Sequence, residues 1–279
     1  MKKIISLLLA LCFLSFSPVV ILASTAKIEI DGENQYKALR LTPQIYNAAN
    51  SDLSDLLLKN SKGETVPYFI YRTKMGKEDY FIESLAPKFT TQSFDKNDKK
   101  TDIMIDGLKN MRLHDVTIDT DSMFKRTITI PNGRTKEIYN LSLNGVSEVD
   151  TTISLGGQIA YDDTYVMTID DADDKPINVN NITVRYYADE LVFEGKAGEV
   201  FTLEFGEDPT KTAPVYDIER YKDEILKGTI DRVAISEIDD TTAKKAVSTE
   251  RDYKFLFNIV IITITLLLGV VILVKLKRT

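Results

Sequence analysis

The sequence is poor in the residues on which metal and thiol chemistry depend. Its 279 residues include no tryptophan, one histidine and one cysteine. The single histidine, His114, excludes zinc sites that need two or more histidines. The single cysteine, Cys12, lies within an apolar N-terminal run and follows Leu11, whereas a lipidated cysteine follows a small residue. The chain therefore has no internal disulfide and must be stabilised by its hydrophobic core.

Positive charge is also in short supply. Lysine and arginine number 35 against 42 aspartates and glutamates, for a net charge of -7. Nucleic-acid binding needs a basic face that neutralises phosphates, so this function class is excluded. Apart from the two ends, no apolar run approaches the roughly 20 residues of a membrane span, which excludes a polytopic membrane protein.

The N-terminus has the pattern of a secretory signal over residues 1–26. Lys2 and Lys3 precede an apolar run from Ile4 to Leu22, and small residues follow. The pattern predicts cleavage after Ala23 or after Ala26. An uncleaved anchor helix is the alternative, because the run is long for a signal peptide.

The C-terminal apolar run, residues 255–274, predicts a transmembrane helix. At 1.5 Å per residue it is about 30 Å long, the thickness of the hydrocarbon core. Lys275, Lys277 and Arg278 follow at once, and the positive-inside rule places them in the cytoplasm. We therefore expect a single-pass protein of the cell membrane, with its ectodomain outside and a short cytoplasmic tail at 275–279.

Between the two ends, short segments that alternate polar and apolar residues predict an all-β ectodomain of two β-sandwiches. We expect the first sandwich at 27–90 and the second, a jelly roll, at 101–212. The helical spacing of Val215, Ile218, Tyr221 and Ile225 predicts an amphipathic helix at 213–228. The polar stretch 229–254 is expected to be a stalk that reaches the membrane.

Two stretches of the ectodomain resemble a bacterial family known as domain of unknown function 3999. The first runs LRLTPQIYNAANSDLSDLLLKNSKGETVPYFIY from Leu39, and the second contains YVMTIDDADDKPINVNNITV, ELVFEGKAGEVFTLEFGEDP and APVYDI. The resemblance implies a membrane-anchored protein whose second domain is like the galactose-binding, discoidin-type jelly roll. The family has no assigned activity, so the resemblance carries over no catalytic residues.

The densest group of carboxylates is the acidic loop, which we define as Asp170, Asp171, Asp173 and Asp174. Four carboxylates this close suit calcium, which takes six to eight oxygen ligands. The spacing is not that of an EF-hand, however, and Lys175-Pro176 is typical of an exposed turn. We therefore favour a surface turn over a calcium site, and we expect no other cofactor.

No catalytic motif accompanies these features. His114 has no second histidine to work with, and no phosphate loop or dinucleotide-binding glycine pattern occurs. Tyr161 with Tyr165, and Tyr186 with Tyr187, are candidates for a platform that stacks on sugars, although adjacent tyrosines in a strand point to opposite faces. We expect a non-enzymatic binding or scaffold protein for an envelope glycan or a membrane-protein partner. A glycan-acting hydrolase and a sensor subunit of a membrane complex are the alternatives.

Overall fold

The computed structural model describes residues 20–21, 24–72, 81–93, 99–206, 211–239 and 245–246. The chain divides into two units. One comprises Met1–Leu22 and Ala243–Thr279, and its described part is β1 (Val20–Ile21) paired antiparallel with β20 (Lys245–Ala246). The other unit, Ala23–Thr242, contains all the remaining described residues.

The expected transmembrane helix at 255–274 and the tail at 275–279 lie outside the described residues, as does most of the expected signal segment. Within the described ranges, no helix has both the length and the apolar composition to cross a membrane.

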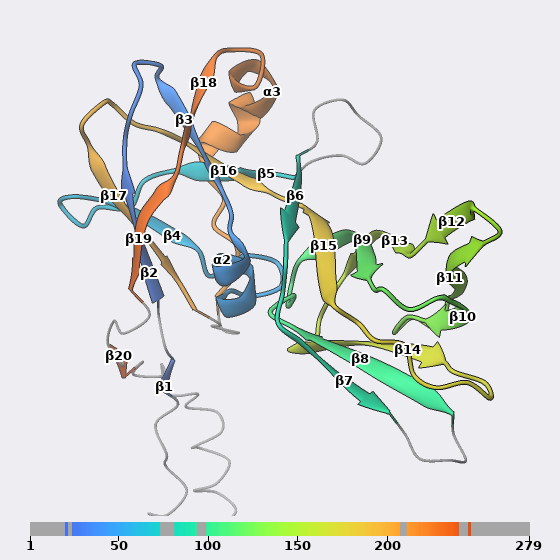
Figure 1. Ribbon diagram of the computed structural model, residues 1–279. Helices are drawn as coiled ribbons and strands as arrows, with labels where there is room; N and C mark the ends of the chain where they lie inside the picture. Colours follow the sequence, from blue (N-terminus) through green and yellow to red (C-terminus); the bar gives the residue numbers. More distant parts are fainter. Residues whose placement is uncertain are drawn as a thin grey trace, which may run out of the picture. The chain divides into compact units, whose positions relative to one another are not determined.

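The predicted all-β architecture is confirmed (Figure 1). Alternation in the sequence becomes alternation in burial, as in β17 (Val200–Phe205), where Phe201, Leu203 and Phe205 are buried and the residues between them are not. Because side chains of a strand point alternately to its two faces, each such strand presents one apolar face to a core. The described strands of the Ala23–Thr242 unit form two pairs of sheets.

The first pair of sheets, here the split sandwich, is built from both ends of the unit. Its sheets have the orders β18-β3-β16-β5 and β19-β2-β17-β4, and only β18 with β3 is parallel. Besides β17, its strands are β2 (Ser24–Glu29), β3 (Tyr36–Arg40), β4 (Leu57–Asn60), β5 (Tyr68–Tyr71), β16 (Glu190–Glu194), β18 (Ile230–Val233) and β19 (Ile235–Asp239).

The second pair, the inserted sandwich, is contiguous in sequence and lies between β5 and β16. Its sheets have the orders β12-β11-β10-β14-β8-β7 and β13-β9-β15-β6. Its strands are β6 (Ile82–Leu85), β7 (Phe89–Ser93), β8 (Lys100–Asp106), β9 (Arg112–Asp119), β10 (Phe124–Thr129), β11 (Thr135–Leu143), β12 (Val146–Asp150), β13 (Thr152–Ile159), β14 (Thr164–Asp170) and β15 (Asn181–Tyr187).

The pairing of the strands differs from the expected ranges. β16 and β17, expected in the second sandwich at 101–212, pair with β3, β5, β2 and β4 of the first. β6, expected in the first sandwich at 27–90, pairs with β15 of the second, and β7, most of which lies between the two expected ranges, pairs with β8. The expected sequential arrangement is therefore replaced by an insertion. Alternation identifies a strand but carries no information about a partner far away in the chain.

Three boundaries are corrected as well. The expected signal segment 1–26 overlaps β2, in which Ala26 is fully buried and pairs with Leu203 and Ile238. The expected stalk 229–254 begins instead with β18 and β19, which are edge strands of the two sheets. The expected helix 213–228 shortens to a 3-10 helix, η1 (Asp217–Tyr221), followed by α3 (Lys222–Ile225).

The short helix packs with only part of its predicted apolar face. Ile225 is buried with Ala38, Phe69 and Val192 in a small cluster on the outer face of β3, β16 and β5, and Ile218 and Leu226 lie at its margin. Of the predicted apolar positions, Ile218 and Ile225 thus meet the sheet, whereas Val215 is 87% exposed and Tyr221 is 63% exposed.

Buried hydrogen bonds join the two sandwiches around α2 (Pro43–Ala48). The Asn110 side-chain amide donates to the carbonyls of Tyr46 and Ala49 over 3.1 and 2.8 Å, and the Asp189 backbone N–H donates to the Tyr46 hydroxyl over 2.7 Å. One hydrophobic core cluster includes residues of both sandwiches. These contacts, here called the junction, therefore fix α2 against the segments around Asn110 and Asp189.

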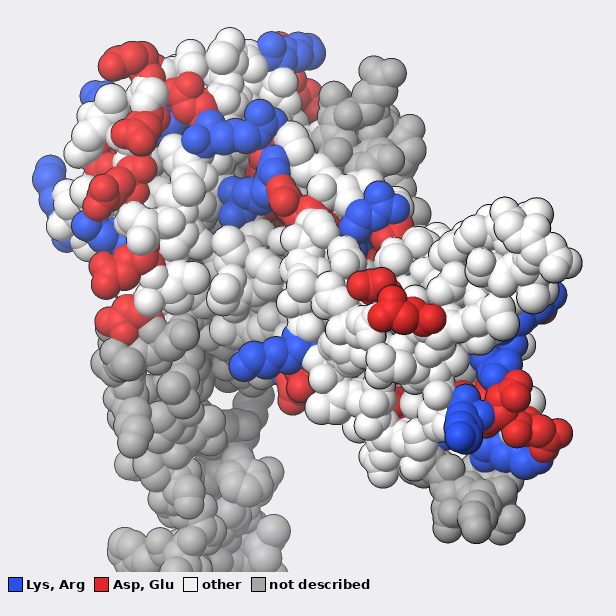
Figure 2. Space-filling model, viewed as in Figure 1, with Lys and Arg blue, Asp and Glu red and all other residues white. Residues whose placement is uncertain are grey.

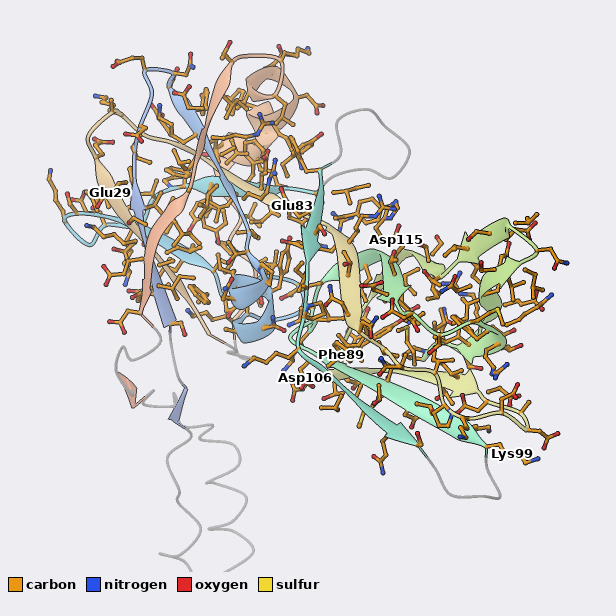
Figure 3. All side chains as sticks on the ribbon, viewed as in Figure 1. Glu29, Glu83, Phe89, Lys99, Asp106 and Asp115 are labelled. Atoms are coloured by element: carbon orange, nitrogen blue, oxygen red, sulfur yellow. The ribbon has the colours of Figure 1, made fainter. Side chains whose placement is uncertain are left out.

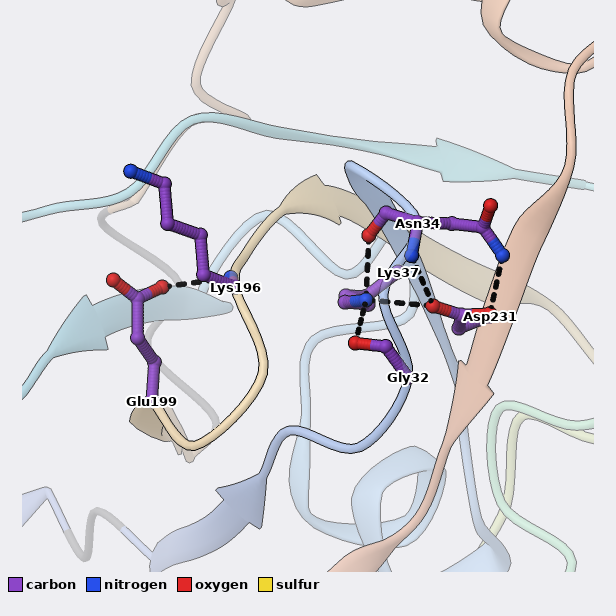
Figure 4. Close-up of polar contacts among 6 residues, drawn as sticks. All are labelled: Gly32, Asn34, Lys37, Lys196, Glu199 and Asp231. Atoms are coloured by element: carbon purple, nitrogen blue, oxygen red, sulfur yellow. Dashed lines mark hydrogen bonds and ion pairs between the residues drawn. The ribbon is translucent and has the colours of Figure 1, made fainter.

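A buried lysine fixes the C-terminal strand β18 to the split sandwich (Figure 4). Lys37 on β3 is fully buried, and its Nζ donates to the Gly32 carbonyl over 3.0 Å, to the Asn34 carbonyl over 2.5 Å and to Asp231 Oδ2 over 2.7 Å. Asn34 also donates to Asp231 through its backbone N–H and its side chain. All three ammonium protons thus have acceptors, so the buried side chain leaves no hydrogen-bond donor unsatisfied.

Candidate functional site

The acidic loop lies at the C-terminal end of β14, and the protein itself pairs most of its carboxylates. Asp173 forms an ion pair with Lys99, and Asp174 pairs with Arg126 over 2.8 Å. Asp170 Oδ1 accepts a hydrogen bond from the Ala172 N–H over 3.1 Å, which closes a local turn. The Lys99 ammonium lowers the pKa of Asp173. Lys99 lies at the far end of the inserted sandwich in Figure 3.

Asp171 is the exception, because it is buried. Its Oδ2 accepts a hydrogen bond from the Thr101 hydroxyl over 2.6 Å, and its backbone N–H donates to the Lys99 carbonyl over 2.8 Å. Its Oδ1 is also buried, and no described atom donates to it. The four carboxylates therefore point to different partners, and the described residues contain no group of three or more His, Cys, Asp or Glu able to hold a metal ion. The geometry is that of an ion-paired turn, and the calcium site stays the less favoured alternative to be tested.

His114 belongs to a small polar cluster on β9 and β15. Its Nδ1 lies 2.7 Å from Asp115 Oδ2, and Arg185 binds both oxygens of Asp115 through Nε and Nη2. Burial acts to raise the pKa of Asp115, but the hydrogen bonds from Arg185 and His114 outweigh it and leave the pKa below its ordinary value. The His114 ring meets the edge of Tyr187 with a centroid separation of 5.2 Å. The cluster is a stabilised ion pair that orients the imidazole.

Neither tyrosine of the Tyr186–Tyr187 pair is available as a sugar platform. Tyr186 is 4% exposed and Tyr187 is 6% exposed. Tyr186 packs edge-on against Tyr46 within the junction. The expectation that one member of the pair lies in the core is met, and the other is covered too.

The tyrosines at 161 and 165 have a different environment, because both line a pocket of about 400 Å³ in the inserted sandwich. The pocket lies where the β10–β11 turn meets the β13–β14 loop. Tyr161 is 65% exposed, so its ring is free to contact a ligand. The lining residues are Thr129, Ile130, Pro131, Asn132, Gln158, Ile159, Ala160, Tyr161, Asp162, Thr164, Tyr165, Val166 and Thr168.

The polar groups of this pocket are mainly amides and hydroxyls. Asn132 Nδ2 donates to Gln158 Oε1 over 3.1 Å, which links the β10–β11 turn to the end of β13. Asn132 Oδ1 in turn accepts from the Arg134 N–H over 3.0 Å. Burial raises the pKa of Tyr165 to about 12, and no described group hydrogen-bonds to its hydroxyl. Asp162 is the one charged residue of the described lining.

A second pocket, of about 380 Å³, shares Tyr161 with the first. It lies where the segment after α2 meets the loop between β8 and β9. Its lining residues are Asn50, Ser51, Asp52, Ser54, Lys109, Asn110, Tyr161 and Lys211. Serine hydroxyls and the Asn50 amide recur here beside two lysines and one aspartate.

Sequence reasoning selected Tyr161 and Tyr165 but missed the amides that accompany them. Asn132 stands in the Pro131–Gly133 turn, where an asparagine ordinarily signals nothing more than turn chemistry. Sequence reasoning also missed Asp189, which is buried at the junction and pairs with Arg112 over 2.5 Å. Burial raises the pKa of Asp189, against the opposing effect of Arg112.

No protein-family model matches the chain, and no curated protein or solved structure matches it. The resemblance to domain of unknown function 3999 and to discoidin-type jelly rolls therefore stays a prediction.

Proposed function

We propose that this chain is a membrane-anchored, extracytoplasmic protein that binds a neutral glycan of the cell envelope and performs no chemical step on it. The observation that carries the proposal is the pocket beside Tyr161. Its volume of about 400 Å³ is within the range of small-ligand sites. Its residues supply the two kinds of contact that a sugar needs.

The first kind of contact is apolar. A sugar ring has faces of C–H groups, and an exposed aromatic ring offers them a flat apolar partner while its hydroxyl stays solvated. Tyr161 meets this requirement because it is 65% exposed at the pocket edge. The apolar side chains of Ile130, Pro131 and Val166 add to this surface.

The second kind of contact is polar and uncharged. Side-chain amides both donate and accept hydrogen bonds, and threonine hydroxyls do the same, so they match sugar hydroxyls and acetamido groups. Asn132, Gln158, Thr164 and Thr168 provide such groups in the described lining. A strongly charged ligand would find few partners there.

Hydrolysis is disfavoured because the described lining of the pocket has a single carboxylate. Most glycoside hydrolases place two carboxyl groups on either side of the scissile bond. The described lining contains one, Asp162. Its neighbour Asp163 pairs with Lys109 over 3.3 Å.

The membrane placement rests on the sequence. The apolar run 255–274 and the basic residues after it support a single-pass anchor with the sandwiches outside. Protease added to intact protoplasts is expected to digest the chain except for a small C-terminal fragment. Survival of the intact chain, while a control surface protein is cut, would refute this topology.

Glycan binding is tested with the full-length protein in detergent micelles and with purified envelope polysaccharide from the same cells. Replacement of Tyr161 by Ala is expected to weaken binding about tenfold, because about 1.4 kcal/mol of stacking is lost. Tyr221→Ala is the matched control, since Tyr221 is 63% exposed and lies in η1, outside both pockets. Equal binding by the two variants would contradict the proposal.

A further inference from the structure

Tyr161 lines two pockets at once, and the two have nearly the same size. The first has a volume of about 400 Å³ and the second about 380 Å³. A side chain shared in this way stands on the wall between them. A ligand that contacts the exposed ring of Tyr161 can therefore continue into either pocket.

The second pocket is held together across the junction of the two sandwiches. Asn110, in its wall, donates to the carbonyls of Tyr46 and Ala49, and the Asn110 N–H donates to the Ala160 carbonyl next to Tyr161. On the other wall, the Asn50 N–H donates to Asp55 Oδ1 over 2.9 Å and its side-chain amide donates to Ser54 Oγ over 2.9 Å. A wall fixed before binding loses little conformational entropy when a ligand enters.

The charges of the second pocket nearly balance. Lys109 is ion-paired with Asp163 over 3.3 Å, which leaves Lys211 against Asp52. Such a surface does not select a polyanion, because no excess of cations remains. Ser51 and the Asn50 amide, by contrast, match the hydroxyl and acetamido groups of a sugar.

We infer that the two pockets are successive subsites for one linear, neutral oligosaccharide, with Tyr161 stacked on the sugar between them. This inference rests on the proposed glycan-binding function and extends it to the length of the ligand. An oligosaccharide that fills one pocket meets the second pocket at a high effective concentration, because the second contact is intramolecular. The site therefore prefers oligosaccharides long enough to reach both pockets.

The experiment measures binding of β-1,4-linked N-acetylglucosamine oligomers of increasing length, from the dimer upward, to the full-length protein by titration calorimetry. The expected result is a rise in affinity of at least about tenfold with length, followed by a plateau. A dimer that binds as tightly as the longer oligomers would overturn the two-subsite inference and leave the proposed function intact. Absence of binding to every oligomer and to the envelope polysaccharide would overturn both.

A blocking variant provides the second arm. Ser51 is exposed and lines the second pocket, so Ser51→Tyr is expected to abolish the gain in affinity with oligomer length. Ser147→Tyr adds the same bulk at an exposed position on β12 and is expected to leave the length dependence intact. If the two variants keep the same length dependence, the second pocket is not a subsite.

Discussion

The two sandwiches share an architecture but differ in how the chain builds them. The inserted sandwich is contiguous, from β6 to β15, and it carries the pocket beside Tyr161. The split sandwich draws β2 to β5 from one end of the unit and β16 to β19 from the other. Both sandwiches contain long-range pairings, such as β6 with β15, but the pairings of β16 and β17 with β2 to β5 span the whole insertion. We therefore expect assembly of the split sandwich to be the slower step.

The distribution of polar groups follows the same division. The split sandwich buries a charged network at Lys37 and Asp231, which ties its two halves together. The inserted sandwich leaves apolar side chains exposed, with Leu143, Val146 and Val149 each at least 60% exposed on the β11–β12 hairpin. In the space-filling view of Figure 2, the end of the inserted sandwich where these strands lie has few charged side chains, whereas acidic and basic groups alternate over the split sandwich. One sandwich therefore ties together the two ends of the Ala23–Thr242 unit, and the other leaves apolar side chains exposed.

The largest effect is expected from removal of Ser24, Thr25 and Ala26. It tests whether the split sandwich depends on strands from both ends of the Ala23–Thr242 unit. These residues pair with Phe205, Glu204 and Leu203 of β17, and Ala26 is fully buried. A chain that starts at Lys27 should lose the cooperative unfolding transition of the split sandwich. We therefore expect the mature protein to retain Ser24–Ala26, so that signal cleavage does not occur after Ala26. Intact-mass measurement of the protein purified from membranes checks this, and a mature N-terminus at Lys27 would contradict it.

The next largest effect is expected from Asp231→Ala. The substitution removes the carboxylate partner of the fully buried Lys37 and leaves that charge with two carbonyl acceptors. The melting temperature should fall by about 10 °C, because an uncompensated buried charge is strongly destabilising. Glu29→Ala is the control, since it removes an exposed partner of Lys27 and should change the melting temperature little. Similar melting temperatures for the two variants would show that the network does not hold β18.

A smaller effect, which depends on pH, should distinguish Asp115 in the inserted sandwich from Asp189 at the junction. At neutral pH, Asp115→Asn should cost about 1–2 kcal/mol, because it weakens the charge-assisted hydrogen bonds from Arg185 and His114. The pKa of Asp115 lies below its ordinary value of 3.8. Its stabilisation is therefore present above pH 3.8 and is lost as the pH falls through the lowered folded-state pKa. The difference between wild type and variant should shrink only in that acidic range.

Asp189→Asn is the matched variant and should show the opposite slope. Burial raises the pKa of Asp189, so its ionised form is disfavoured in the folded protein. Wild-type stability should therefore increase, relative to the Asn variant, as the pH falls through the raised pKa toward the ordinary value. Urea unfolding of both variants between pH 3 and pH 7 measures the two slopes, and parallel curves would refute the assignment.

The smallest effect is expected at the acidic loop. Lys99 and Arg126 already pair with Asp173 and Asp174, so millimolar calcium should leave the melting temperature unchanged. A calcium ion that bound the folded state would raise it by mass action. A rise that disappears in the double variant Asp171→Asn, Asp173→Asn would establish the calcium site that the sequence also suggested.

The strands were predictable because alternation has a local physical cause. Segments such as Val200–Phe205 and Thr164–Ile169 alternate in sequence because one face of each is buried. Their partners were not predictable in this way, since β16 pairs with β3 across an insertion that leaves no mark in either strand. The charged residues Asp231, Arg232 and Glu237 predict a solvated stalk for β18 and β19. In the structure, Asp231 instead forms an ion pair with Lys37, and β19 pairs with β2.

The candidate site was predictable only in part. Tyr161 and Tyr165 were selected as aromatic residues close together in sequence, and both line the first pocket. Asn132 comes from the β10–β11 turn, Gln158 from the end of β13 and Asn50 from the segment after α2, and only the folded chain brings them to Tyr161. Tyr186 and Tyr187 gave an equal aromatic signal, but both are buried.

The position of β19 determines where a pulling force from the C-terminal segment would act on the fold. β19 pairs with β2, from Ile235 opposite Ile28 to Asp239 opposite Thr25, at the edge of its sheet. If the C-terminal segment anchors the protein in a membrane, as proposed, tension between a held glycan and the bilayer enters the sandwich through β19. That tension is resisted first by the β2–β19 ladder and then, on the neighbouring strand β18, by Asp231 against Lys37. The Lys37–Asp231 ion pair contacts Gly32 and Asn34, beyond the end of β2 that is remote from Asp239, so it bears load only after the β2–β19 ladder has opened.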